Sequence, residues 1–137
     1  MTPHAVAKPL PIVTPLDEPY WEYTRQGELR IQRCTDCDAF RYPSSALCPD
    51  CGSEHATWTR VSGKGTVFSW VVFHKCYFPG FAGEMPYNVA MIRLDEGPLF
   101  VANIVDVDNA AIRSGMPVEV VFDRVDERFT IPRFRPA

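Results

Sequence analysis

Two C-x-x-C pairs in the first half of the chain constrain its fold more than any other feature. Cys34 and Cys37 form the first pair, and Cys48 and Cys51 form the second after a gap of ten residues. Each pair places two sulfurs on one tight turn, and a hairpin between the turns brings the four sulfurs together as a tetrahedron. We therefore predict one four-cysteine metal site in a small zinc ribbon.

Zinc is the metal we expect, because a small ribbon with all four positions filled is a closed structural site. Iron in the same thiolate cage would look alike in the sequence, so iron stays an alternative. A closed site offers no position to a substrate, and we expect no metal catalysis. The residues around the cysteines are small or polar, which suits backbone amides that turn in to hydrogen-bond the thiolates. They are Thr35, Asp36, Asp38, Asp50, Gly52 and Ser53.

The rest of the chain is patterned for β-strands. Thirteen prolines in 137 residues disfavour long helices, and the one helix expected is short, with Asp17 as its cap, Pro19 in its first turn and Gly27 at its end. The expected strands are 29–34, 66–74, 88–95, 99–106, 117–125 and 128–134. The last five, with an insertion at 108–116 between the third and fourth of them, indicate a small closed barrel of the OB type. We expect an irregular loop over 77–87, and one helical turn closed by Gly115 within 108–116.

These elements divide the chain into three parts. We expect a proline-rich extended arm over 1–15, the helix and zinc ribbon over 16–62, and the OB-fold domain over 63–137. The Gly-x-Gly break at Gly63 and Gly65 marks the boundary between the last two. The fold class is therefore mainly β.

Charge and hydropathy limit the partners. The net charge is −3 and the isoelectric point is about 5.6, which argues against binding to a nucleic-acid backbone. No apolar run is long enough to span a membrane, and the N-terminus lacks the charged start and apolar core of a signal peptide. We expect a cytoplasmic protein without nucleic-acid or membrane partners.

No local pattern predicts catalysis. None of the three histidines lies beside a nucleophile in a recognised motif, and the carboxylates are spread along strand faces and loops. Cys76 lies outside the four-cysteine set; it follows His74 and Lys75, which favours a reactive thiol, but a part-buried cysteine at a strand end is the plainer interpretation. The sequence therefore predicts a binding or assembly module.

The order of elements resembles a family of bacterial and archaeal proteins in which a rubredoxin-like zinc ribbon precedes an acyl-CoA-associated OB-fold domain. The motifs that carry the resemblance are Q-R-C-x-x-C, CPDCGS and S-G-x-G-T-V, and it covers about residues 16–135. It implies that Cys34, Cys37, Cys48 and Cys51 are the zinc ligands. Asp38 departs from the family, in which a glycine is usual at this position.

The resemblance also implies a function. Members look like non-catalytic accessory subunits that bind acyl-CoA and dock thiolase-superfamily enzymes for thiolysis, condensation or retro-aldol cleavage of a sterol side chain, and some occur with hot-dog-fold hydratases. Candidate contacts for the CoA diphosphate are Lys64, Lys75, Arg93 and Arg113, although a residue of this kind is more often a solvated surface charge. Candidate contacts for a partner or for the pantetheine chain are Tyr77, Phe78, Phe81 and Tyr87, although these rings can equally plug the end of the barrel.

Two other functions compete with this one. Ribbons and OB barrels often bind single-stranded nucleic acid by stacking bases on aromatic side chains, which the acidic net charge disfavours. A small electron carrier that holds iron in the cysteine cage is the other. Colour distinguishes this last alternative, because a ferric thiolate protein is red and a zinc protein is colourless.

Overall fold

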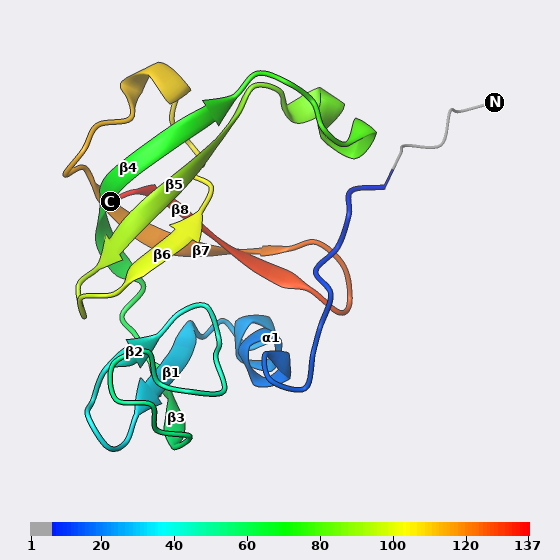
Figure 1. The fold of residues 1–137 in the computed structure, drawn as a ribbon. Helices are drawn as coiled ribbons and strands as arrows, with labels where there is room; N and C mark the ends of the chain where they lie inside the picture. The colour runs from blue at the N-terminus through cyan, green and yellow to red at the C-terminus, as the bar shows by residue number, and fades with distance from the viewer. Residues whose placement is uncertain (1–6) are drawn as a thin grey trace.

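The computed structural model describes residues 7–137, which form one short α-helix and eight β-strands in two sheets (Figure 1). Helix α1 (Glu18–Arg25) precedes a three-stranded antiparallel sheet. In that sheet β1 (Arg30–Cys34) lies between β2 (Phe40–Arg41) and β3 (Ala56–Arg60). The sequence did not predict β2 or β3, because β2 is only two residues long and β3 carries a single large apolar side chain.

The second sheet contains the five strands expected after residue 63. They are β4 (Lys64–Phe73), β5 (Tyr87–Leu94), β6 (Leu99–Ala102), β7 (Pro117–Arg124) and β8 (Thr130–Pro136). They lie in the antiparallel order β6-β5-β4-β7-β8, and a parallel bridge between Ile104 and Phe134 joins the two ends of the sheet. The amide of Phe134 donates to the carbonyl of Asn103 at 3.0 Å across this seam. The predicted five-stranded OB-type barrel is therefore confirmed.

The ribbon and the barrel share one hydrophobic core. Strand β5 alternates, and its inward side chains Ala90, Ile92 and Leu94 are fully buried. The same buried cluster contains Leu29, just before β1, and Ile31 of β1. The two modules therefore pack as one unit.

Gly63 allows the chain to approach β7 closely at the point where it enters the barrel. Its φ of 76° is in the left-handed region, and a Cβ there would collide with the side chain of Val120. The amide of Val120 donates to the Gly63 carbonyl at 2.7 Å. The first glycine of the Gly-x-Gly break thus packs directly against β7.

Strands β4 and β5 continue as a hairpin that projects beyond the barrel (Figure 1). β4 pairs with β7 only over Lys64–Thr66, whereas it pairs with β5 as far as Phe73. The 3₁₀ helix η1 (Pro79–Glu84) forms the tip, where an irregular loop was expected. The arm crosses this tip, since Lys8 forms an ion pair of 2.6 Å with Glu84. Residues 7–14 are neither helix nor strand, and the first six residues of the predicted arm lie outside the described residues.

Three local expectations differ in detail. Asp17 is the residue before α1 but makes no side-chain capping bond, because its carboxylate accepts hydrogen bonds from the amide and hydroxyl of Thr14 at 2.6 and 2.9 Å. The helical turn η2 (Asn109–Ala111) ends before Gly115, whose amide instead donates to the Val67 carbonyl at 2.7 Å. Strand β6 ends at Ala102 rather than at residue 106, because the chain then crosses the seam.

Within residues 7–137, no helix has the length and apolar character required to cross a membrane.

Candidate metal centre and the cleft beside it

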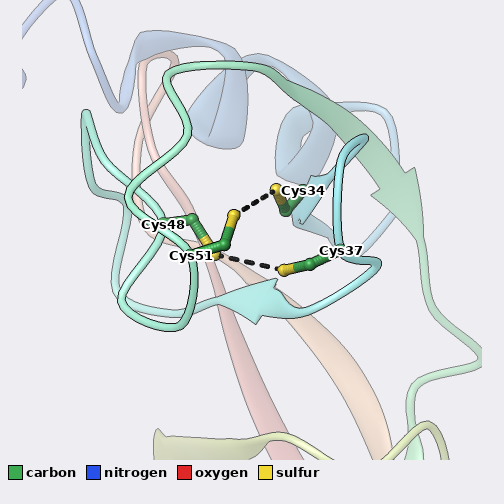
Figure 2. Close-up of side chains that lie close together, drawn as sticks. All are labelled: Cys34, Cys37, Cys48 and Cys51. Carbon is green, nitrogen blue, oxygen red and sulfur yellow. Dashed lines mark hydrogen bonds between the residues drawn. The ribbon is translucent and has the colours of Figure 1, made fainter.

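The four cysteine sulfurs of the two C-x-x-C pairs point toward one another (Figure 2) and all lie within 4.8 Å of each other. Two of the separations are 3.6 Å, from Cys34 to Cys51, and 3.5 Å, from Cys37 to Cys48. A tetrahedral ion with metal–sulfur bonds of about 2.3 Å needs sulfurs about 3.8 Å apart. The cluster therefore fits one tetrahedral metal ion held by four thiolates.

The two metal-binding turns have the same backbone geometry. The Cys34 amide donates to the carbonyl five residues later at 2.8 Å, and the Cys48 amide does the same at 2.8 Å. The residue four positions after the first cysteine of each turn donates its amide back to the carbonyl of that cysteine, from Asp38 at 3.0 Å and from Gly52 at 2.9 Å. The turns are thus two copies of one structure facing each other.

Backbone amides surround the sulfurs, as the small and polar neighbours predicted. Cys34 receives amide hydrogen bonds from the residues two and three positions later, and Cys48 receives the same pair. Burial raises the pKa of Cys34, yet these hydrogen bonds lower it overall to about 6. The amide of Cys51 is the main cause that lowers the pKa of Cys48. These amides favour the thiolate form that binds metal.

A polar network ties the two turns together. The Ser53 hydroxyl donates to the Asp36 carboxylate, and His55 Nδ1 lies 3.3 Å from the same carboxylate. The Ser53 hydrogen bond is the largest cause that lowers the pKa of Asp36. Arg41, which is only 2% exposed, donates to the carbonyls of Ser53 and His55 at 2.8 and 2.9 Å. The charge of Arg41 also lowers the pKa of Asp36, so this buried cation favours the carboxylate that links the two turns.

The four candidate cations do not form one group. Lys64 and Arg93 lie on the outer face near the start of β4, where the Arg93 guanidinium is 5.1 Å from the Phe68 ring. The segment that contains Arg113 also reaches this region, since the next residue donates its hydroxyl to the Phe68 carbonyl. Lys75 follows the other end of β4, and ten residues of strand span about 30 Å. Lys75 therefore belongs to the hairpin tip.

The four candidate aromatic residues do gather at that tip. Phe73 lies between Tyr77 and Tyr87, with ring centroids 6.2 and 5.1 Å away. Phe81 is 5.5 Å from Tyr87 and 6.3 Å from Phe78. Tyr77 and Phe78 are 59% and 52% exposed, whereas Phe81 and Tyr87 are half-buried. Part of this aromatic cluster thus faces outward, and its function stays a prediction.

A cleft between the ribbon and the barrel was not predicted. Its volume is about 430 Å³ and its walls are largely aromatic and aliphatic. The ring of Tyr42 stacks on Phe100 with centroids 4.4 Å apart, and the Tyr42 hydroxyl donates to the Val101 carbonyl at 3.5 Å. Burial raises the pKa of both Tyr20 and Tyr42. The aromatic residues of α1 were the only signal of this cleft, because its other walls come from distant segments.

Comparison with known proteins identifies the family. The model for the rubredoxin-like zinc ribbon domain of ChsH2 matches residues 21–56, and the model for the C-terminal OB-fold domain of ChsH2 matches residues 58–123. The chain belongs to the ChsH2 (DUF35) family. This confirms the resemblance and the fold class derived from the sequence.

Several ChsH2-family relatives are similar over most of this chain. A probable enoyl-CoA hydratase alpha subunit from Thermomonospora curvata is 40% identical over 122 residues, which are 88% of this chain and 38% of that protein. The chain thus spans well under half of that relative. A DUF35 domain-containing scaffold protein from Pyrococcus furiosus is 32% identical, with 79% of each chain covered.

Solved structures of the ChsH2 family agree with this fold. A chain of the Ltp2-ChsH2(DUF35) aldolase superposes with a TM-score of 0.84 and 37% identity, covering 93% of this chain and 98% of that one. A DUF35 protein from Sulfolobus solfataricus has a TM-score of 0.63 at 14% identity, with 90% and 86% covered, and shows the shared fold alone.

Proposed function

We propose that this chain is a non-catalytic accessory subunit that docks a thiolase-superfamily enzyme and helps to hold its acyl-CoA substrate. The observation that carries the proposal is the similarity, at a TM-score of 0.84, to a chain of the Ltp2-ChsH2(DUF35) aldolase along nearly its whole length. The relatives described as scaffold proteins in three archaea favour the same role. Two hydratase alpha subunits among the relatives make a hot-dog-fold hydratase the alternative partner.

The metal site supports a structural part for the ion. Four cysteines fill the four positions of the tetrahedron, so a bound ion would fold the ribbon and leave no position for substrate. Zinc is the ion we propose, with iron as the alternative. The metal content and the colour of the purified protein distinguish the two.

The cleft is where we place the acyl group. Its volume of about 430 Å³ falls within the range of about 300–1,000 Å³ that small-molecule sites have. Val101, at its rim, pairs with Met91, and Arg93 lies two residues further along β5. Both apolar side chains are exposed, 44% and 39% respectively. A pantetheine chain laid over them would bring its diphosphate to Arg93.

The four candidate cations are then assigned to two binding sites, one for the CoA diphosphate and one for the enzyme partner. Lys64, Arg93 and Arg113 are the proposed diphosphate contacts, because the first two lie on the outer face beside the start of β4 and the third is in the adjoining segment. Lys75 and the aromatic cluster of the hairpin tip are the proposed contacts with the partner. The exposed rings of Tyr77 and Phe78 support this part, since aromatic anchors dominate many protein interfaces.

The test is capture of the partner from cells of the source organism with this chain as bait, followed by mass spectrometry. A thiolase-superfamily enzyme recovered in fixed ratio is the expected result. Recovery of only nucleic acid and its enzymes would overturn the proposal and favour single-strand binding. The complex and the partner enzyme alone are then titrated with acetyl-CoA and free CoA, with this chain in a Trp70→Phe background. The difference between the two titrations reports Trp21 and Trp58 at the cleft. A larger response to acetyl-CoA than to CoA is expected.

A further inference from the structure

The far half of β4 has a backbone edge with no strand beside it among residues 7–137. Near its start the edge is covered, because β7 pairs with Lys64–Thr66 and the Gly115 amide donates to the Val67 carbonyl at 2.7 Å. The Ser114 hydroxyl caps the next carbonyl, that of Phe68, at 3.3 Å. From there to Phe73 the described part of the chain supplies hydrogen-bond partners only from β5.

The pairing of β5 identifies the free groups. Two hydrogen bonds show which residues of β5 direct their backbone groups toward β6. The Leu94 amide donates to the Pro98 carbonyl, and the Asn88 carbonyl accepts from the Asn103 side chain. The alternate residues of β5 therefore face β4, and they pair with Ser69, Val71 and Phe73. The N–H and C=O groups of the two residues between these, Trp70 and Val72, point away from β5 toward the free edge.

This edge lacks the protection that soluble proteins usually give to edge strands. Lysine, proline and bulges normally prevent an edge from pairing with another chain. Residues 68–73 contain no charged residue and no proline, and the bulge lies before the free part, between Val67 and Ser69. Phe68 and Val71 are 49% and 56% exposed. A β-branched and aromatic strand with these features is suited to strand addition.

The charges at the two ends of this free edge indicate which kind of strand can pair with it. Arg113 lies in the segment that borders its start, and His74 and Lys75 follow its end; neither 68–77 nor 113–116 contains an acidic residue. Antiparallel pairing with a second copy would place Lys75 of one chain beside Arg113 of the other. Like charges opposed in this way disfavour the pair. The edge instead complements an apolar strand with carboxylates at both ends.

We propose that the edge of β4 at Trp70 and Val72 accepts an extended strand from the enzyme partner, so that the barrel sheet continues into that enzyme. The inference rests on the proposed function, because it names how the partner docks. Backbone hydrogen bonds supply the attachment, and the flanking cations select a strand that carries acidic residues at its ends.

Amide hydrogen exchange on the chain alone and on its complex with the co-purified enzyme tests this docking. In the free chain the amides of Trp70 and Val72 exchange quickly, and those of Val71 and Phe73 exchange slowly. In the complex we expect exchange at Trp70 and Val72 to slow by about 100-fold or more. A stable complex in which both amides stay fast overturns the docking mode and leaves the accessory function standing. Failure to form any enzyme complex overturns both.

Other occupants give different exchange patterns. Protection in the free chain that disappears on dilution would assign the edge to a second copy. Protection in the free chain that disappears when residues 1–6 are deleted would assign it to the N-terminal arm. Either result overturns the proposal.

Two substitutions separate backbone pairing from charge. Val72→Pro removes the N–H that faces the edge, while the neighbouring residues keep their bonds to β5, and the enzyme complex should be lost. Circular dichroism and metal content show whether this variant folds. Lys75→Glu needs no backbone change and should weaken the complex about tenfold. Arg124→Glu, on β7, is the matched charge reversal and should leave the affinity unchanged; equal effects of the two reversals would overturn the proposed charge selection.

Discussion

Asp38 and Gly52 occupy the same position in the two metal-binding turns, and both have left-handed backbones, with φ of 65° and 77°. A glycine adopts this conformation without steric cost, whereas an aspartate does not. Each residue donates its amide to the first cysteine of its turn, so the conformation is required in both. The first turn therefore carries strain that the second avoids.

Asp38→Gly should raise the free energy of unfolding by about 0.5 kcal/mol, and Gly52→Ala should lower it by about 1 kcal/mol. Urea unfolding of the zinc-loaded protein measures both. A loss of stability in Asp38→Gly would mean that the contact with Arg33, whose Nε lies 4.0 Å from the Asp38 carboxylate, outweighs the strain.

Removal of one metal ligand should unfold the ribbon. Cys34→Ser deletes a sulfur of the tetrahedron, and structural zinc contributes about 10–16 kcal/mol of apparent binding energy in small modules. We expect this variant to lose stoichiometric zinc, as measured by mass spectrometry of metals, together with near-ultraviolet dichroism. Cys76→Ser is the matched control, because Cys76 lies at the hairpin tip with its thiol 3.0 Å from the Phe78 carbonyl. One zinc per chain should remain in that variant.

The stacking of Tyr42 on Phe100 should contribute strongly to stability. Tyr42→Ala removes a half-buried ring between the modules, and we expect a loss of about 2–3 kcal/mol in thermal or urea unfolding. Tyr42→Phe keeps the ring and loses only the long hydrogen bond of 3.5 Å to Val101, so a loss below about 1 kcal/mol is expected. Equal losses in the two variants would contradict a role for the ring.

Stability should fall at alkaline pH because of the phenols in the cleft. Burial raises the pKa of Tyr20 well above its ordinary value, and the phenol of Tyr42 raises it further. A raised pKa in the folded state contributes stability below the unfolded value of about 10, and this stability is lost as the pH rises through the folded pKa. Tyr20→Phe should therefore reduce the loss of unfolding free energy between about pH 9 and pH 11.

Absorbance at 295 nm gives a second measure of the same phenol. The rise in absorbance that the unchanged protein shows and Tyr20→Phe lacks should occur at the high-pH end of the titration. If the missing signal instead belongs to the earliest part, the Tyr20 phenol is not shielded from water.

The metal site was predictable because all of its information is local. Two C-x-x-C pairs fix both the ligands and the turns, and the amide hydrogen bonds follow from the residues next to them. The strands of the barrel were predictable for a similar reason, since β5 alternates apolar and polar side chains. The sequence missed β3, which gains its strand conformation by pairing with β1 over five positions.

The cleft was not predictable because its walls meet only in three dimensions. Tyr20, Tyr42 and Phe100 come from the helix, the ribbon and the barrel, and no spacing in the sequence relates them. Lys64 and Lys75 illustrate the converse case. They are close in sequence, yet an extended strand separates them, so proximity along the chain did not make them one site.

The stack between Tyr42 and Phe100 also limits how such chains can be recombined. The two family models meet near residue 57, which invites the use of the ribbon and the barrel as interchangeable parts. A chimaera joined at that point would remove the Tyr42 ring that stacks on Phe100 of the barrel. It would also expose the core residues that the two halves bury together. For protein engineering, the smallest portable cassette is therefore the helix, the ribbon and the barrel carried over intact.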